Sequence, residues 1–269
     1  MRMIGGTMRT ISRCFNHICT QNYKSLGFSR LHSTFIRRKK DILQVFSLKC
    51  SQSLPICSVE FGIFPLCLPQ PVYFDAGGYM LDEFIVDLHG RNSGWTFDAS
   101  SDESIMNCIE SISQALDLYL MPFFEACSDC NTSLAQLVWL EELFDRNRKK
   151  TLYLRGDSDA AAPWQERSLF DSRKYYMALK ARNLPYAQQY LIHQIDFYKN
   201  RLKSFDASSV SKQPTIVRER FSAKLALCVE QLERIESGDF SYFDDLLNFN
   251  ENKMDQFLAT KYPRLRYDK

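Results

Sequence analysis

The strand patterns of this chain are gathered in one block, with helical patterns before and after it. Between residues 28 and 64, "FSRLHSTFIR" and "DILQVFSLKC" are typical of strands, and "ICSVEFGIF" alternates apolar and polar side chains with the period of two that indicates a strand. The "RKKD" turn joins the first two, which predicts an antiparallel β-meander with one buried face. Two more short strands are expected in "EFIVDLHG" and "GWTFDA". This order of elements predicts an α+β fold, with the meander packed against helices.

Helical periodicity flanks the meander on both sides. Before it, residues 8–26 place apolar side chains at helical spacing. After it, Ser100 or Ser101 is expected to cap a helix whose apolar stripe covers one face of the sheet. The stripe consists of Ile105, Ile109, Ile112, Leu116, Tyr119 and Phe123. Asn131 or Thr132 is expected to cap the next helix.

The last third of the chain has helical periodicity only. Two helices are expected to meet near residues 183–185, and Pro214 opens a third that Gly238 ends. This third helix is expected to carry an apolar stripe of Val217, Phe221, Leu225, Cys228, Leu232 and Ile235. Shorter helical pieces are expected in "DFSYFDDLLNF" and "MDQFLATKYP". Because the Gly- and Ala-containing stretch before these helices is typical of a linker, we predict an α+β domain, a linker and an all-α domain of helical-hairpin type, at residues 1–150, 151–164 and 165–269.

Charge is distributed unevenly along the chain. Residues 1–50 carry ten Lys or Arg and one acid, whereas residues 51–150 carry five Lys or Arg and fifteen Asp or Glu. A nucleic-acid binder needs a basic face that is free of intramolecular carboxylates. We therefore expect the two segments to neutralise each other, and a nucleic-acid partner is not favoured.

The cysteine content and the apolar runs indicate the compartment. The nine cysteines are odd in number and irregularly spaced, which favours free thiols in a cytoplasmic protein over a disulfide framework. The richest apolar segment is broken by Pro65, Pro69 and Pro71, so no membrane span is expected. The first forty residues lack acids, as organellar transit peptides do, but their helical spacing favours a folded element.

A CxxC spacing, Cys127 and Cys130, is the first candidate for chemistry. A structural zinc needs four ligands, and no second Cys/His pair follows at a suitable spacing. A redox pair belongs at a helix start, whereas this pair follows a helix. The sequence therefore predicts a helix junction here, with no metal and no cofactor.

A second candidate lies in "DLHGR", where Asp87, His89 and Arg91 alternate onto one strand face. His89 could act as a general base oriented by Asp87, while Arg91 held an anion. The competing interpretation is a solvated strand end. No phosphate-binding loop, nucleophile elbow, metalloprotease helix or dinucleotide fingerprint is present in the sequence.

A third candidate is a surface for a protein partner. The basic hairpin tip and a nearby tryptophan would supply it: Arg37, Arg38, Lys39, Lys40 and Trp95. The alternative for the tip is a solvated turn.

The order of these signals resembles that of a known family. A first helix is followed by "LGFSRLHSTFIRRKKDILQVFSLKCS", "VEFGIF", "DLHGR", "GWTF", an acidic helix start and "LYLMPFFEACSDCNTSLAQL". Over residues 8–145 this order resembles the bacterial domain of unknown function family 4304. The resemblance implies a compact α+β domain without established catalytic residues. Some domains of this kind resemble immunity proteins of bacterial toxin systems.

Three functions remain open at this point. The first is a non-catalytic protein-binding module, immunity-like in a bacterial toxin system. The others are an uncharacterised hydrolase with a site around His89 and a nucleic-acid-associated regulator. Because a binding surface needs no catalytic constellation, the lack of catalytic motifs favours the binding module.

Overall fold

The computed structural model describes residues 2–51, 54–69, 79–80, 95–155, 172–207 and 215–263. Its sheet is antiparallel, with the order β1-β2-β3-β4-β5, and β6 also pairs with β4. The strands are β1 Ser29–Leu31, β2 Thr34–Lys39, β3 Ile42–Cys50, β4 Ile56–Pro65, β5 Tyr79–Met80 and β6 Trp95–Thr96. The expected α+β fold with a β-meander and C-terminal helices is confirmed.

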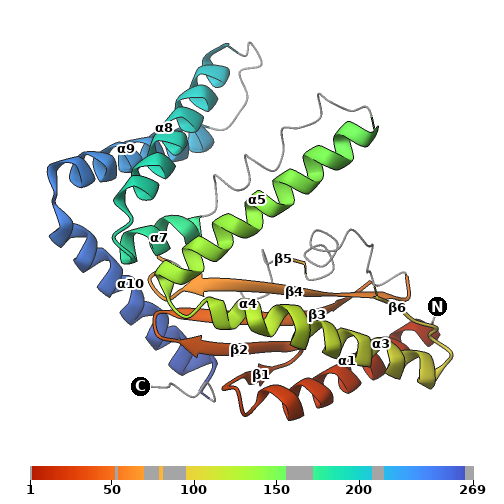
Figure 1. Ribbon diagram of the computed structural model, residues 1–269. Coiled ribbons are helices and arrows are strands. Elements are labelled where there is room, and N and C mark those ends of the chain that lie inside the picture. Colours follow the sequence, from red (N-terminus) through yellow and green to blue (C-terminus); the bar gives the residue numbers. More distant parts are fainter. Residues whose placement is uncertain are drawn as a thin grey trace.

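Helices surround this sheet (Figure 1). In chain order they are α1 Arg2–Tyr23, α3 Asp102–Ala115, the π-helical turn η1 Leu116–Leu120, α4 Met121–Ala126, α5 Cys130–Arg155, α7 Ser172–Lys180, α8 Leu184–Ala207, α9 Thr215–Ser237 and α10 Phe240–Lys261. Within the described residues, no helix combines the length and the apolar character that crossing a membrane requires.

The segment "FSRLHSTFIR" forms two strands, so the prediction of one strand is wrong. β1 and β2 are joined by a tight turn in which His32 has a φ of 52°, and Leu31 pairs with Thr34. The sequence offers no Asn-Gly or Gly-Gly pair there, the usual mark of such a turn. A second reversal follows at Lys40, with a φ of 46°, where the "RKKD" turn was predicted.

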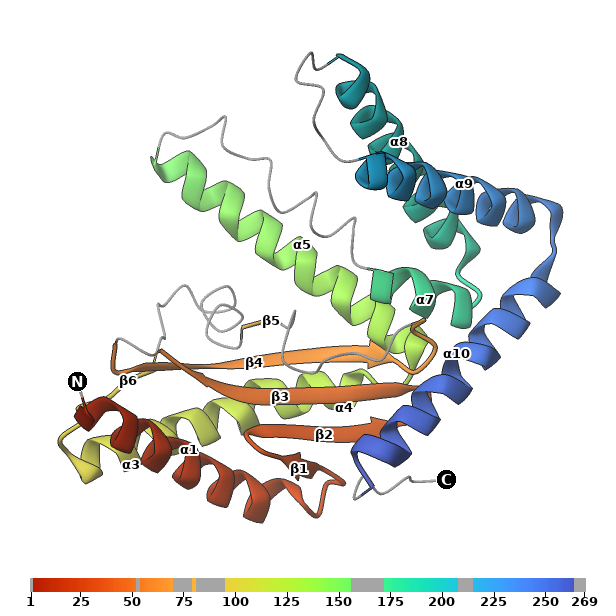
Figure 2. The same ribbon diagram turned by 180° about the vertical axis from the view of Figure 1, so that it is seen from behind.

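The sheet is buried on both faces over β2, β3 and the end of β4, so the expectation of one buried face is wrong. On one face Phe35, Phe46 and Phe61 lie in the large core beneath α1, α3 and α4. On the other, the second core is closed by α10: Ile36, Leu43, Val45, Phe64, Leu66, Leu68, Met254 and Leu258. Figure 2 shows α10 alongside the ends of β2 and β3. The strand pattern could not reveal a cover that comes from the far end of the chain.

The helix after β6 begins as the sequence predicts. Ser101 caps α3 by accepting a hydrogen bond from the backbone N–H of Ser104, at 3.1 Å. Ile105, Ile109 and Ile112 are buried in the large core, as expected from their spacing. Pro122 lies in the first turn of α4, where the missing N–H is tolerated.

The C-terminal region consists of helices, some of which pack against the sheet. α7 and α8 meet at the predicted junction, and Gly238, with a φ of 75°, ends α9. The two shorter pieces expected after it form one continuous helix, α10, because its buried positions keep one stripe: Phe243, Leu247, Asn250, Met254 and Leu258. The predicted boundary at residue 150 falls inside α5, and residues 156–164 of the predicted linker lie outside the described residues. The division into domains stays a prediction.

Candidate functional site

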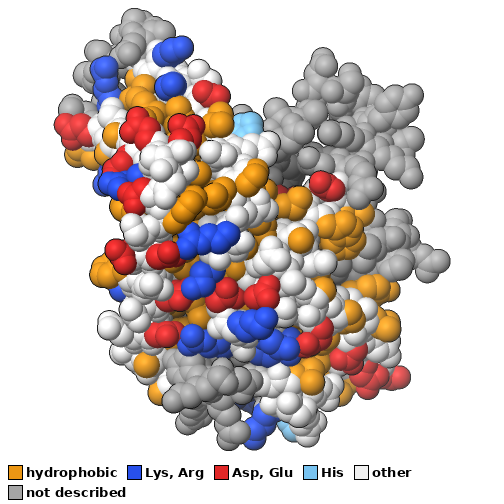
Figure 3. Space-filling model, turned by 60° about the vertical axis from the view of Figure 1, so that its left-hand side comes forward, with side chains coloured by type: hydrophobic (Ala, Val, Ile, Leu, Met, Phe, Trp, Pro, Cys, Tyr) orange, Lys and Arg blue, Asp and Glu red, His pale blue; other side chains and the backbone are white. Residues whose placement is uncertain are grey.

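The basic hairpin tip is largely neutralised by carboxylates from other elements. Arg38 pairs with Asp255 of α10 at 2.7 Å. Lys39 reaches Glu125 at 3.0 Å and Lys40 reaches Asp129 at 2.9 Å. The interleaved charges are visible in Figure 3. The pairs of Lys39 and Lys40 join the basic segment to carboxylates of residues 51–150, as expected, whereas Asp255 lies outside that acidic segment.

Arg37 lies inside the protein rather than on the tip. Its side chain is 4% exposed, against 68% for Lys40. The guanidinium donates to Gln44 Oε1 at 2.7 Å, pairs with Glu125 at 2.7 Å and lies 4.6 Å from the ring centre of Phe28. Burial acts to raise the pKa of Glu125, but hydrogen bonds from Lys39 and Arg37 outweigh it and hold that pKa below its ordinary value. Lys40, with its exposed side chain, is therefore the residue of this tip that a partner could reach most easily.

The first turn of α5 is capped by Asp129, so the expectation of Asn131 or Thr132 as the cap is wrong. Asp129 Oδ1 accepts from the backbone N–H of Thr132 at 3.0 Å, and Thr132 Oγ1 accepts from that of Asp129 at 3.1 Å. Asp41 adds a second carboxylate by accepting from the N–H of Cys130 at 3.0 Å. The backbone bond from Thr132 and the ammonium of Lys40 lower the pKa of Asp129 to about 2.

The two thiols of the CxxC spacing are buried and carry no sign of a functional site. Cys127 is 0% exposed, and burial raises its pKa to about 12. Cys127 directly follows α4 and Cys130 begins α5, so the pair lies at the predicted helix junction. A hydrogen bond with Cys67 and burial raise the pKa of Cys130. Among the described residues no group of three His, Cys, Asp or Glu side chains could hold a metal ion.

The acid-base candidates Asp87, His89 and Arg91 lie outside the described residues. Their role stays a prediction.

Trp95, the fifth residue expected at a partner surface, begins β6 and is 7% exposed. Its indole N–H donates to Ser111 Oγ of α3 at 3.3 Å.

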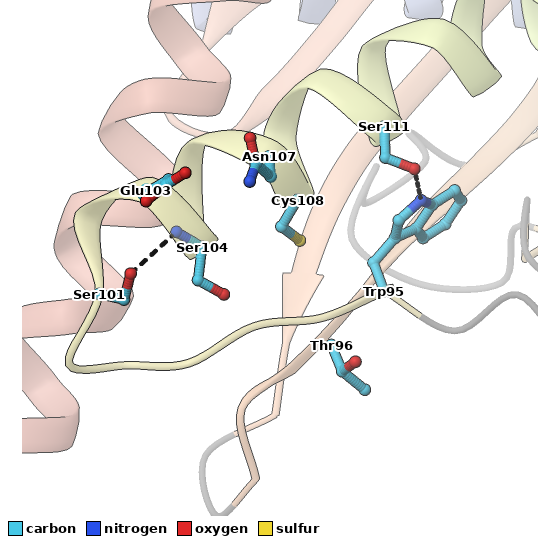
Figure 4. Close-up of a pocket in the computed structure, with 8 residues that line it drawn as sticks. All are labelled: Trp95, Thr96, Ser101, Glu103, Ser104, Asn107, Cys108 and Ser111. Carbon is cyan, nitrogen blue, oxygen red and sulfur yellow. Dashed lines mark hydrogen bonds between the residues drawn. The ribbon is translucent and has the colours of Figure 1, made fainter.

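Trp95 borders a surface hollow of about 500 Å³ between β6 and α3 (Figure 4). The lining is polar apart from the indole and one thiol: Trp95, Thr96, Ser101, Glu103, Ser104, Asn107, Cys108 and Ser111. The sulfur of Cys108 points away from the helix axis, toward the strands. Cys108 is 6% exposed, so the hollow brings a mostly buried thiol close to the surface.

Two more thiols lie behind Cys108. Its Sγ is 3.8 Å from Sγ of Cys57 on β4, and the thiol of Cys57 in turn lies close enough to Cys50 on β3 to affect its pKa. Cys50 and Cys57 are direct partners in the β3–β4 ladder. We call Cys50, Cys57 and Cys108 the thiol cluster. Sequence reasoning missed it, although the strand register, once known, places the first two together.

The α8–α9 hairpin differs from the rest of the protein in its burial. We call residues 196–205 of α8 and 216–230 of α9 the arm, which lies apart from the sheet in Figures 1 and 2. No described side chain in the arm is fully buried. Its rings pack mainly on one another: Phe221 lies 5.7 Å from both Phe205 and Tyr198. The arm is thus a two-helix structure without a third covering layer among the described residues.

Helix α9 carries apolar side chains on two opposite faces. The predicted stripe faces inward and is half-buried or buried: Val217, Phe221, Leu225, Cys228, Leu232 and Ile235. On the outer face Ile216 is 58% exposed and Leu227 is 47% exposed, with the exposed Ala223 between them. Ile216 and Leu227 are eleven positions apart, about three helical turns, so they lie on one line along the helix. We call Ile216, Ala223 and Leu227 the outer stripe.

Comparison with known proteins adds no relative from which a role could be transferred. No family model matches the chain, and neither does a curated protein or a solved structure. The resemblance of residues 8–145 to family 4304 stays a prediction.

Proposed function

We propose that this protein is a non-catalytic protein-binding module that uses the outer stripe of α9 as its contact surface. The observation that carries the proposal is the pair of large aliphatic side chains, Ile216 and Leu227, aligned on one exposed helix face. Single exposed apolar residues are common on any surface. An aligned set on a protruding hairpin resembles the apolar centre of an interface, which a polar rim surrounds.

The charge of the arm defines the chemistry of the partner. The arm contains six Lys or Arg and three Asp or Glu. Arg220 and Lys224 are exposed beside the outer stripe. Complementary charge speeds encounter and selects among partners. The partner that fits is a protein with an apolar patch bordered by carboxylates.

The packing of the rings favours a protein over a nucleic acid. A single-strand binder needs aromatic faces on which bases can stack. In the arm, Phe205 stacks on Phe221 with an angle of 16° between the rings, and Arg201 lies 5.3 Å from the ring centre of Phe197. These faces are engaged by other side chains.

Two features outside the arm extend the proposal to a location and a kind of partner. All nine cysteines are free thiols, which supports the cytoplasmic location included in the proposal. The resemblance of residues 8–145 extends the proposal to an immunity-like role, with a bacterial toxin as the partner.

The test is affinity capture with a double variant, Ile216→Glu with Leu227→Glu. Phe249→Glu, at a residue that is 59% exposed on α10, is the matched control. We expect one acidic protein to be recovered equally by the wild type and the control, and roughly tenfold less by the double variant, as the loss of about 1.4 kcal/mol predicts. Binding of that protein, once purified, should weaken with salt.

Two results would contradict the proposal. One is equal recovery of every protein by the double variant and the wild type. The other is tight binding of a fluorescent single-stranded oligonucleotide that the double variant abolishes, which would assign the arm to a nucleic acid.

A further inference from the structure

The thiol cluster combines three features that the buried CxxC pair lacks. Cys108 borders the hollow, its Sγ is within 3.8 Å of a second thiol, and that thiol contacts a third. By contrast, Cys127 and Cys130 line no described hollow, and both thiols have raised pKa values. The reactivity of cysteine increases with thiolate character and with access to the reagent.

The contacts within the cluster shift the pKa values of its three thiols in different directions. The bond from Cys57 lowers the pKa of Cys108 and also that of Cys50, while the same two contacts raise the pKa of Cys57. Either sulfur can donate in the Cys57–Cys108 contact, and this contact lowers the pKa of Cys108. Of the two lowered thiols, Cys108 is the one that borders the hollow.

We propose that Cys108 is a peroxide-reactive thiol and that Cys57 resolves its oxidised form into a Cys57–Cys108 disulfide. In the first step the Cys108 thiolate attacks one peroxide oxygen, the O–O bond breaks, and the leaving hydroxide takes a proton to become water. Cys108 is oxidised to the sulfenic acid and hydrogen peroxide is reduced. In the second step the sulfur of Cys57 attacks the sulfur of Cys108, and its proton leaves with the hydroxyl group as a second water.

The arrangement of the strands and the helix makes this bond reachable. The two sulfurs must approach from 3.8 Å to about 2.05 Å, a movement that side-chain rotation and a small shift of α3 can supply. The bond would link β4 to α3 across the lip of the hollow. Oxidation would thus fix the helix that supplies five of the eight lining residues.

Cys50 offers the competing bond. The backbone N–H of Ser51 donates to the carbonyl of Ile56 at 2.9 Å, so the next pair, Cys50 and Cys57, is a non-hydrogen-bonded pair with closely spaced side chains. Cys50 is half-buried and therefore more exposed than Cys108, but Cys108 is the thiol that borders the hollow, through which we infer that peroxide enters. We therefore assign Cys108 as the first thiol to be oxidised.

The test treats the intact chain with hydrogen peroxide and maps its thiols by mass spectrometry after digestion. We expect a linked Cys57–Cys108 peptide and seven remaining free thiols. Cys108 should react roughly tenfold faster than Cys130. In the Cys57→Ser variant, a sulfenic-acid trap such as dimedone should accumulate on Cys108, because its resolving thiol is gone.

The Cys67→Ser variant is the matched control, since Cys67 contacts Cys130 in a buried thiol pair elsewhere. It should form the Cys57–Cys108 bond at the wild-type rate. A Cys50–Cys57 bond as the main product would overturn the proposal. So would equal rates at Cys108 and Cys130, or no bond at all. If Cys57→Ser does not fold, the wild-type peptide map decides by itself.

Discussion

The strands that end at the hairpin tip and the helices of the arm both carry apolar side chains, but the two regions differ in how many layers cover them. At the tip, α4 and the start of α5 cover one face of β2 and β3, and α10 covers the other. Side chains there are buried even when they are polar, as Arg37 and Gln44 are. In the arm, two helices cover only each other, as far as the described residues extend. The comparison teaches that burial here depends on the third layer more than on composition.

The largest expected difference concerns two phenylalanines. Phe46 is 0% exposed and stacks on Phe35 with a centroid distance of 5.0 Å, whereas Phe221 is only half-buried. We expect Phe46→Ala to lower the free energy of unfolding by about 4 kcal/mol. Phe221→Ala should lower it by about 1 kcal/mol. Urea denaturation followed by circular dichroism measures both. Equal losses would show that the arm is as well covered as the tip.

A smaller effect is expected at a buried amide of the tip. The side-chain amide N–H groups of Gln44 donate to the carbonyls of Phe124 and Cys127, at 2.5 and 2.7 Å. Both carbonyls lie at the C-terminal end of α4. Gln44→Leu removes a buried donor to both carbonyls and the acceptor of the Arg37 Nε–H, which should cost about 3 kcal/mol. The control is Gln189→Leu on the exposed face of α8. A loss below about 0.5 kcal/mol at Gln44, as at a surface site, would mean that water replaces the amide.

The helix cap at the tip should give a modest, pH-dependent effect. Asp129→Ala removes the cap of α5 and should cost about 1 kcal/mol at neutral pH. Because the pKa of Asp129 is lowered from 3.8 to about 2 in the folded protein, the ionised carboxylate stabilises the fold above pH 4. This contribution is lost as the pH falls toward 2, so the difference between wild type and variant should shrink over that interval. Asp196→Ala, on the exposed face of α8, serves as the control. A difference that is constant with pH would contradict the ionised cap.

The smallest stability change is expected on the outer stripe. Ile216→Glu and Leu227→Glu each replace an aliphatic side chain that is already about half exposed with a charged one. Each should change the free energy of unfolding by no more than about 0.5 kcal/mol. A loss of several kcal/mol in thermal or urea denaturation would show that the outer face packs against another part of the chain.

The sequence predicted what depends on local periodicity. The cap at Ser101, the apolar stripe of α3, the junction of α7 and α8 and the end of α9 at Gly238 were all expected, because each depends on residues within a few turns of one another. The continuous length of α10 was missed. Its stripe was interpreted as two pieces, although its buried positions follow one another without a break.

The rest depends on contacts between distant residues, which periodicity does not encode. Nothing near Arg37 indicates that Glu125 and Gln44 will bury it, and nothing near Leu43 indicates that Met254 will cover it. The thiol cluster required the β3–β4 register together with the position of α3. The spacing of Ile216 and Leu227 in the sequence already indicated the outer stripe, but only the inner stripe was predicted.

The most direct test of the central claim, that the outer stripe of α9 binds a protein partner, is site-specific photo-crosslinking. A photoreactive amino acid at position 227 would be compared in cell extract with the same residue at position 249, which is also exposed. The account predicts one crosslinked acidic protein from position 227 and none from position 249, with Arg220→Glu reducing the yield. The same crosslinks from both positions, or none from position 227, would contradict it.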